Sequence, residues 1–157
     1  MFEEHYPSTS GDKVASICGF ASGKLLLSIF AQGIFIFDPV TGNKQPFTII
    51  DKEVNERLCL HGNTVNVYRN TPNTILLLGN HVYCYHLKEK QFSIVSEEKG
   101  INIIEGSLKA IACDGHSTYL NDIKHVYELD NHSNRLRVLF TAQDDMNINS
   151  VSMDESG

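Results

Sequence analysis

The sequence predicts an all-β fold, a partial β-propeller of about three four-stranded antiparallel blades with stray strands at its ends. Two observations carry this prediction. Val14-Ala15-Ser16-Ile17 is followed at a fixed distance by Ser22-Gly23, and Ile148-Asn149-Ser150-Val151 is followed at the same distance by Ser156-Gly157. Apolar runs separated by turn residues also recur every ~40–50 residues, a spacing typical of propeller blades.

The first predicted blade covers residues 13–50, with strands expected at 14–20, 24–30, 33–38 and 45–50. The run Ile34–Phe37 is apolar on both faces, as expected for a strand that lies between neighbouring sheets. The segment Asp38–Asn43 contains Pro39 and Gly42, which favour a tight turn between the third and fourth strands.

The second and third predicted blades cover residues 63–96 and 107–142 and repeat the pattern of the first. Leu25-Leu26-Leu27 corresponds to Ile75-Leu76-Leu77, since 75 − 25 = 50, and His81-Val82-Tyr83 corresponds to His125-Val126-Tyr127, since 125 − 81 = 44. The expected strands are 64–70, 74–79, 81–87 and 92–96, then 108–114, 117–122, 125–130 and 135–141.

The ends of the chain are predicted to belong to incomplete blades of the same single domain, 1–157. Residues 1–12 resemble an outer strand and a linker, and residues 147–157 resemble the first strand of a truncated blade. Because three blades do not close a ring, we expect both end sheets to expose apolar faces. We therefore expect self-association, with two chains head to tail as one arrangement.

Composition excludes several classes of function. The net charge of −6 offers no basic surface for nucleic acid or for an anionic membrane. The most apolar stretch, 25–37, is shorter than the ~20 apolar residues of a membrane-spanning helix. The acidic start, Met1-Phe2-Glu3-Glu4-His5, is not a secretory signal peptide, so any export signal is expected outside this chain.

The sequence predicts neither a metal site nor a cofactor. The four cysteines are far apart, and Cys18, Cys84 and Cys113 fall in predicted strands, where Cys behaves as a small apolar residue. Disulfide pairing is left open, because it depends on the compartment. His81 and His86 are five residues apart on a strand, so their side chains point to opposite faces.

Catalysis is not predicted either. The carboxylates considered for a hydrolytic pair are Asp38, Asp122, Asp130, Asp144 and Asp145. Asp38 and Asp130 occupy matching turn positions, where Asp ordinarily accepts hydrogen bonds from nearby backbone N–H groups. The sequence has no nucleophile elbow, phosphate-binding glycine loop or Cys–His dyad. The chain is therefore expected to be a binding module.

The candidate ligand-binding residues are Arg57, Asn63 and Arg69, which lie on or beside the connection 51–62. Such connections run over one face of a propeller, where binding residues are commonly mounted. Several tyrosines have the amphipathic ring that stacks on sugars. Their strand positions favour packing between blades instead: Tyr68, Tyr83, Tyr85, Tyr119 and Tyr127.

The segments Ser16-Ile17, Ser22-Gly23, Leu25–Ser28, Gly33–Phe37 and Asp38–Asn43 resemble the two-component-regulator propeller repeat. The resemblance implies a propeller segment of a hybrid two-component sensor histidine kinase. It would lie on the periplasmic or extracellular side of the inner membrane and sense a small molecule or oligosaccharide, with the kinase elsewhere in the parent protein. Two alternatives stay open, namely a protein-interaction propeller of another lineage and a fragment of a propeller glycosidase or lyase.

Overall fold

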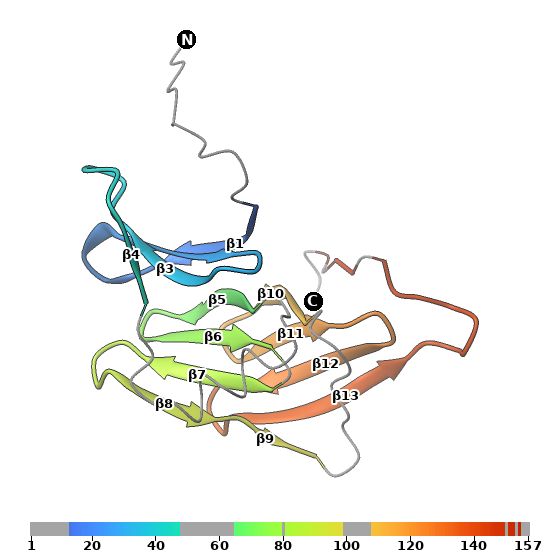
Figure 1. Ribbon diagram of the computed structural model, residues 1–157. Helices are drawn as coiled ribbons and strands as arrows, with labels where there is room; N and C mark the ends of the chain where they lie inside the picture. Colours follow the sequence, from blue (N-terminus) through green and yellow to red (C-terminus); the bar gives the residue numbers. More distant parts are fainter. Residues whose placement is uncertain are drawn as a thin grey trace.

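The described residues of the computed structural model are 13–47, 65–79, 81–98, 108–149, 151–152 and 154. They form three sheets in chain order, coloured blue, green and orange in Figure 1, and the four main strands of each sheet are antiparallel. The all-β, partial-propeller prediction is confirmed. The predicted strand and linker at 1–12 lie outside the described residues, as does the connection 51–62.

Blade 1 contains the repeated Ser-Gly motif between its first two strands and shows what that motif does. Its sheet contains, in order, β1 (Val14–Gly19), β2 (Leu25–Ile29), β3 (Gly33–Phe37) and β4 (Lys44–Pro46). A short 3₁₀ turn, Ala21–Gly23, joins β1 to β2. Ser22 and Gly23 both have left-handed backbone angles, with φ of 58° and 73°. Glycine suits this place because it adopts such angles without steric cost.

Blades 2 and 3 repeat the four-stranded order of blade 1. Blade 2 contains β5 (Asn66–Thr71), β6 (Thr74–Leu78), β7 (Val82–His86) and β8 (Gln91–Ile94). Blade 3 contains β10 (Lys109–Cys113), β11 (Ser117–Asn121), β12 (His125–Asp130) and β13 (Arg135–Thr141). Each of these strands overlaps the range that the sequence predicts for it.

The strand β9 (Ser96–Glu97) was not predicted. The N–H of Val95 still bonds to Val82 O in blade 2 at 3.1 Å, whereas the N–H of Ser96 bonds to Asn134 O in blade 3 at 2.9 Å. From that point β9 runs parallel to β13 and adds a fifth strand to the outer edge of blade 3 (Figure 1). It covers backbone groups of β13 that would otherwise be unpaired.

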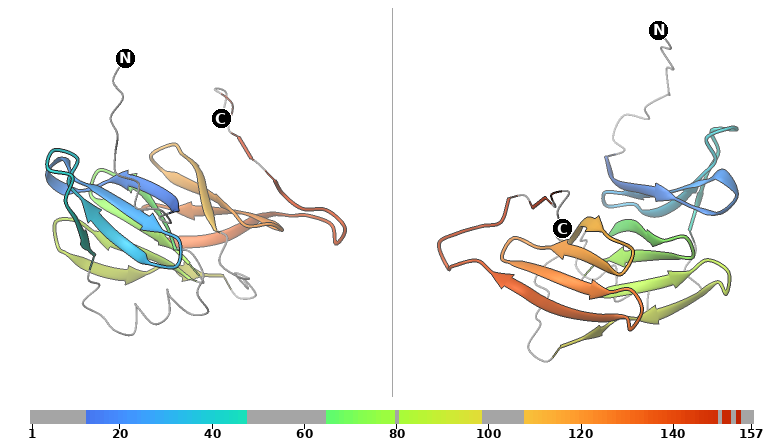
Figure 2. Two further views of the ribbon diagram at one scale, coloured as in Figure 1. Left: turned by 45° about the horizontal axis from the view of Figure 1, so that its top comes forward. Right: turned by 180° about the vertical axis from the view of Figure 1, so that it is seen from behind.

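The inner strands of the three blades adjoin one another, as expected for radially arranged sheets (Figure 2). The N–H of Val67 in β5 donates to Ser16 Oγ in β1 at 2.8 Å. On the other side of β5, Asn66 Nδ2 donates to Leu108 O beside β10 at 2.7 Å. Blade 2 is thus held between its two neighbours by hydrogen bonds as well as by packing.

Two apolar cores lie between the blades. Blades 1 and 2 enclose a cluster around Leu26, Ile75 and Tyr83, and blades 2 and 3 enclose one around Leu76, Leu120 and Tyr127. Side chains alternate between the two faces of a strand, so each blade packs one face on the blade before it and the other on the blade after it.

The face that blade 3 turns away from blade 2 is polar at its centre. Cross-strand pairing places Tyr119, Glu128 and Arg137 side by side there. Arg137 forms an ion pair with Glu128, and Ser117 Oγ donates to the same carboxylate at 2.7 Å. The expectation of an apolar outward face at both ends is therefore wrong for the centre of blade 3. A charged pair is satisfied by water and does not need a neighbouring apolar sheet.

The predicted first strand at 147–157 has no strand pairing among its described residues. The N–H of Ile148 instead donates to Ile123 O at 2.8 Å, which holds this segment against the turn between β11 and β12. A strand requires a hydrogen-bonded neighbour along its length. Its assignment to a further blade stays a prediction.

Candidate functional site

Of the three predicted binding residues, Arg69 is among the described residues. Arg69 is exposed in β5, where its Nη2 donates to Pro72 O at 2.6 Å and its Nε to Thr71 O at 3.4 Å. These bonds close the turn between β5 and β6, and the side chain also lies against Gly19 of β1. Arg57 and Asn63 lie outside the described residues, so the binding role of the three residues stays a prediction.

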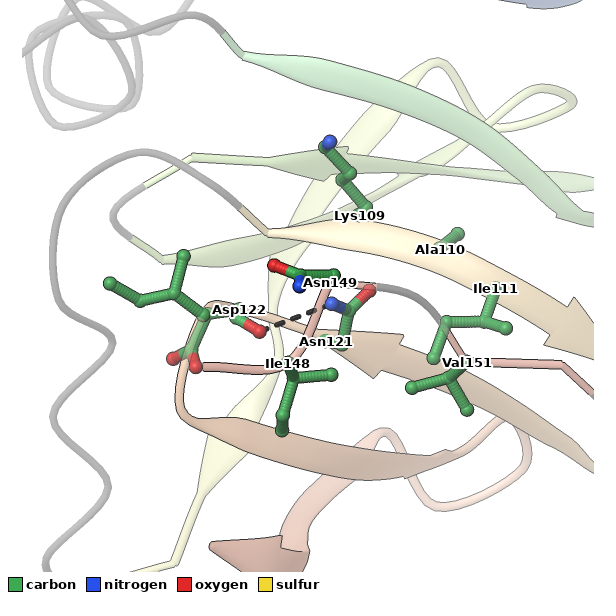
Figure 3. A pocket seen from close by; sticks show the side chains of 9 residues that line it. Lys109, Ala110, Ile111, Asn121, Asp122, Ile148, Asn149 and Val151 are labelled. Atoms are coloured by element: carbon green, nitrogen blue, oxygen red, sulfur yellow. Dashed lines mark hydrogen bonds between the residues drawn. The ribbon is translucent and has the colours of Figure 1, made fainter. Parts of the chain in front are cut away.

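A pocket of about 360 Å³ lies in blade 3, between its inner strands and the later residues Ile148, Asn149 and Val151. Figure 3 shows β10 on one side of it and the later segment on the other. Its lining combines aliphatic side chains with two amides, an ammonium group and a carboxylate: Lys109, Ala110, Ile111, Asn121, Asp122, Ile123, Ile148, Asn149 and Val151. A volume of this size is within the ~300–1,000 Å³ typical of small-molecule sites.

Lys124 holds the chain that leads to the outer wall of this pocket. Its Nζ donates to the backbone carbonyls of Gln143, Asp144 and Met146, at 3.0 Å in the case of Asp144. The N–H of Ala142 returns a bond to Lys124 O at 2.7 Å. One ammonium group with three acceptors thus fixes the path of the segment beyond β13.

Asp122 lies at the end of β11, with 3% of its surface exposed. Its Oδ1 accepts from the N–H of Lys124 at 2.7 Å and from that of His125 at 2.6 Å. Its Oδ2 accepts from the Tyr127 hydroxyl at 2.7 Å, and His125 Nδ1 lies 3.1 Å from both oxygens. Burial alone would raise the pKa of Asp122, but the bonds from Tyr127, Lys124 and His125 outweigh it and hold the pKa below its usual value.

This arrangement is suited to binding and poorly suited to proton transfer. The Asp122 carboxylate already accepts several hydrogen bonds, and its low pKa makes it a weak base. Burial and the adjacent carboxylate raise the pKa of Tyr127 far above its usual range, so that hydroxyl stays protonated. Asn121 Nδ2 donates to Asp122 O at 3.1 Å (Figure 3), so the groups that this side chain can offer to a ligand are its Oδ1 and its second N–H. Lys109 and Asn149 add an ammonium group and a second amide to the lining.

Asp122 has no counterpart in the other blades, which distinguishes it from the turn aspartates. Phe30 and Gly79 stand at the matching place, directly after β2 and β6. In contrast, Asp38 and Asp130 each accept two backbone N–H groups in the hairpin between third and fourth strands. Their predicted structural role is confirmed, and these bonds lower the pKa of both. The neighbouring candidates Asp144 and Asp145 are exposed.

The described histidines do not converge. His81 Nδ1 lies 3.4 Å from Glu97 Oε1, whereas His86 Nε2 lies 2.9 Å from Ser93 Oγ. Within the part of the chain that the structure describes, no group of three His, Cys, Asp or Glu side chains is placed to hold a metal ion.

The prediction that the strand cysteines are small apolar core residues holds for Cys84, which is buried, and for Cys18, which packs partly buried against the core of blades 1 and 2. It is wrong for Cys113, whose Sγ donates to Asn70 O at 3.2 Å and accepts from Asn131 Nδ2 at 3.4 Å. Cys18, Cys84 and Cys113 are free thiols, and Cys84 is buried. Burial raises the pKa of the Cys18 thiol to about 11, against an opposing effect of Arg69, and burial also raises the pKa of Cys84. A raised pKa leaves little of the reactive thiolate at neutral pH.

Comparison with known proteins identifies a fold relative. No family model matches the chain, and no curated protein does. One similar solved structure is the extracellular domain of a hybrid two-component system protein from B. thetaiotaomicron, with a TM-score of 0.59 and 15% sequence identity. The two chains share a fold. The match covers 82% of this chain and 18% of that one, so this chain spans a small part of that domain. No helix among the described residues is long and apolar enough to cross a membrane.

Proposed function

We propose that this chain is a ligand-sensing propeller segment of a hybrid two-component sensor histidine kinase, on the periplasmic or extracellular side of the inner membrane. The observation that carries the proposal is the fold shared with the extracellular domain of a hybrid two-component system protein over 82% of this chain. The repeat segments in blade 1 that resemble the two-component-regulator propeller support it independently.

In this proposal the segment binds and does not catalyse. The buried carboxylate of Asp122 is committed to hydrogen bonds within blade 3. Ligand binding shifts the equilibrium between two arrangements of the receptor, and that shift is transmitted across the membrane. Phosphoryl transfer belongs to the kinase portion of the parent protein.

The ligand class that the blade 3 pocket fits best is an oligosaccharide or a similar uncharged solute rich in hydroxyl groups. Asn121, Asn149 and Lys109 offer amide and ammonium groups to hydroxyls. Ile111 and Val151 offer apolar surface to the C–H faces of a sugar ring. A few polar groups set in an apolar lining are typical of specific small-molecule sites.

The coding sequence on either side of this segment tests the receptor proposal. A downstream membrane span followed by a histidine kinase is the expected result. A gene that encodes neither, and whose product works with a cytoplasmic partner, would contradict the proposal and favour a protein-interaction propeller.

Calorimetry with a panel of neutral oligosaccharides tests the ligand class. Asn121→Ala removes one pocket amide and is expected to weaken binding about tenfold, the equivalent of one good hydrogen bond. Asn43→Ala, in an exposed turn of blade 1, is the matched control and should leave affinity unchanged. If the panel gives no heat of binding, the oligosaccharide class is wrong. The genomic result then still decides the receptor role.

A further inference from the structure

One wall of the blade 3 pocket is carried by the segment 142–149, which belongs to no strand and which we call the strap. It leaves the outer strand β13, swings wide of the sheet and returns toward β10 and β11 (Figure 2). Ile148 and Asn149, near its end, line the pocket. The sheet contributes Ala110 in β10 and Asn121 in β11. The pocket therefore has one wall built into a sheet and one wall formed by a connection.

Two neighbouring residues in the turn between β11 and β12 hold the strap. Lys124 Nζ donates to three strap carbonyls, and Lys124 O accepts from the N–H of Ala142 at 2.7 Å. Ile123 O accepts from the N–H of Ile148 at 2.8 Å. Among the described residues, the hydrogen bonds from the strap to the rest of blade 3 all end on Ile123 and Lys124.

The strap buries little apolar surface of its own. Residues 143–147 are exposed, Met146 with 56% of its surface. Ala142 is buried and Ile148 is half-buried, so the strap has only small apolar contacts, one toward each end. Connections between blades run over one face of a propeller, so this exposure follows from the place of the strap in the fold. A segment with few buried apolar contacts opens at a lower cost in free energy than the sheet beside it.

The turn that holds the strap is itself fixed to the sheet. The buried Asp122 carboxylate accepts from the backbone N–H groups of Lys124 and His125. The Tyr127 hydroxyl donates to the same carboxylate, and the Tyr127 ring is buried in the core between blades 2 and 3. The strap can therefore leave the sheet by breaking its bonds to Ile123 and Lys124, while the turn keeps its place.

We propose that the strap opens and closes as a unit, with Lys124 as its latch, and that the pocket is formed only in the closed state. Opening carries Ile148 and Asn149 away from β10 and β11, which removes one wall. A solute that contacts both walls binds the closed state alone and so shifts the equilibrium toward it. The identity of that solute rests on the proposed function, whereas the opening of the strap does not.

Amide hydrogen exchange of this chain, followed residue by residue by NMR, tests the latch. Lys124→Met keeps the aliphatic stem and removes the three bonds from the ammonium group. We expect exchange at Ala142 and Ile148 to accelerate by the same factor, at least about tenfold, the equivalent of one or two hydrogen bonds. Ile148 is the decisive amide, because its acceptor, Ile123 O, is untouched by the substitution.

The matched control is Lys88→Met, in the exposed hairpin between β7 and β8 of blade 2, and it should leave both amides unchanged. Exchange in β12 checks that Lys124→Met keeps its sheet. The wild type gives a second measure, since Ala142 and Ile148 should respond alike to low concentrations of urea if they open together. Faster exchange at Ala142 with an unchanged Ile148, no change at either amide, or different responses to urea would overturn the proposal.

The panel of neutral oligosaccharides tests the coupling between the pocket and the strap. At ~100 times its Kd, an oligosaccharide that binds is expected to slow exchange at Ala142 and Ile148 about one hundredfold, because it binds the closed state alone. An oligosaccharide that binds and leaves both exchange rates unchanged would overturn the coupling. If none binds, the oligosaccharide class is wrong, and exchange in the ligand-free variants still decides whether the strap opens as a unit.

Discussion

The interface between blades 1 and 2 is packed from aromatic rings, whereas the interface between blades 2 and 3 contains buried hydrogen bonds. In the first, Tyr85 packs edge-on against Phe47, with ring centres 5.3 Å apart, and lies 4.7 Å from Phe92. Phe20 stacks on the same tyrosine at 6.5 Å. Such contacts depend on shape and area more than on direction.

In the second interface, Asn131 Oδ1 accepts from Asn70 Nδ2 at 2.9 Å and from Thr118 Oγ1 at 2.7 Å. Asn70 Oδ1 in turn accepts from Thr74 Oγ1 at 2.8 Å. A hydrogen bond in a buried setting tolerates little change of angle or distance. We infer that blade 3 is fixed to blade 2 in one register, whereas blade 1 is held mainly by the volume that its side chains fill.

The largest expected effect tests whether the two interfaces have equally well-packed cores. Leu26 and Leu76 occupy the same repeat position in the two interfaces, and both are fully buried. Leu26→Ala and Leu76→Ala should each lower the free energy of unfolding by about 2–5 kcal/mol through lost burial and a residual cavity. Urea denaturation measures this loss. A cost below ~1 kcal/mol for Leu26→Ala alone would show that blade 1 is not firmly docked.

The next effect concerns the hydroxyl of Tyr127, whose ring packs between blades 2 and 3 while the hydroxyl itself bonds to Asp122 within blade 3. Tyr127→Phe removes a hydrogen bond to the buried Asp122 carboxylate and should cost about 1.5–3 kcal/mol. Tyr85→Phe is the matched change in the aromatic interface and should stay within ~0.5 kcal/mol, because packing of the ring is retained. Equal costs for the two variants in urea denaturation would show that the hydroxyl bond to Asp122 adds nothing to the packing of the Tyr127 ring.

The pH dependence of stability follows from the same carboxylate. Because the pKa of Asp122 is lower in the folded than in the unfolded chain, its contribution is present above the unfolded pKa and is lost as pH falls through the folded pKa. The advantage of the wild type over Asp122→Asn should be constant near neutral pH and shrink below about pH 4. Thermal melting over that range measures it. An advantage that grows on acidification would contradict the assigned direction.

Much of the fold could be predicted because its determinants are local. Alternating apolar residues and Gly-, Pro- and Asp-containing turns located the strands of all three blades within a few residues. Strand β9 was missed because two residues carry no periodic signal, and its partner Arg135–Leu136 lies far along the chain. The sequence does carry a signal for the polar outward face of blade 3. Glu128 occupies the strand position that Cys84 occupies in blade 2.

The candidate site was less predictable because it depends on contacts between distant residues. Asp122 was considered as a carboxylate, but its bonds to Tyr127 and His125 depend on the geometry of the turn after β11. The anchoring of Gln143–Met146 by Lys124 joins residues about twenty positions apart, without a motif. Arg57 and Asn63 lie outside the described residues, so their prediction is untested.

Single hydrogen bonds between blades give the next comparison. Asn131→Ala removes the acceptor shared by Asn70 and Thr118 and should cost about 1–3 kcal/mol, since both donors stay in a largely buried setting. Ser16→Ala removes one acceptor, that of the Val67 N–H, and should cost about 0.5–1.5 kcal/mol. Urea denaturation of both variants compares the interfaces directly. A larger cost for Ser16→Ala would mean that the bond from the Val67 N–H holds blade 1 more strongly than the Asn131 bonds hold blade 3, and would contradict the inferred difference between the interfaces.

The smallest effect is expected in the exposed hairpins at the outer ends of the blades. Asp38 and Asp130 each accept two backbone N–H groups, so Asp38→Ala and Asp130→Ala should lower Tm by less than any core or interface variant above. Asp38→Asn keeps an acceptor oxygen and should restore most of the loss. Differential scanning calorimetry resolves such changes. The Asp38 hairpin leads into β4, and Phe47 just beyond it packs in the aromatic interface. If Asp38→Ala lowered Tm nearly as much as Leu26→Ala, this hairpin would control the docking of blade 1.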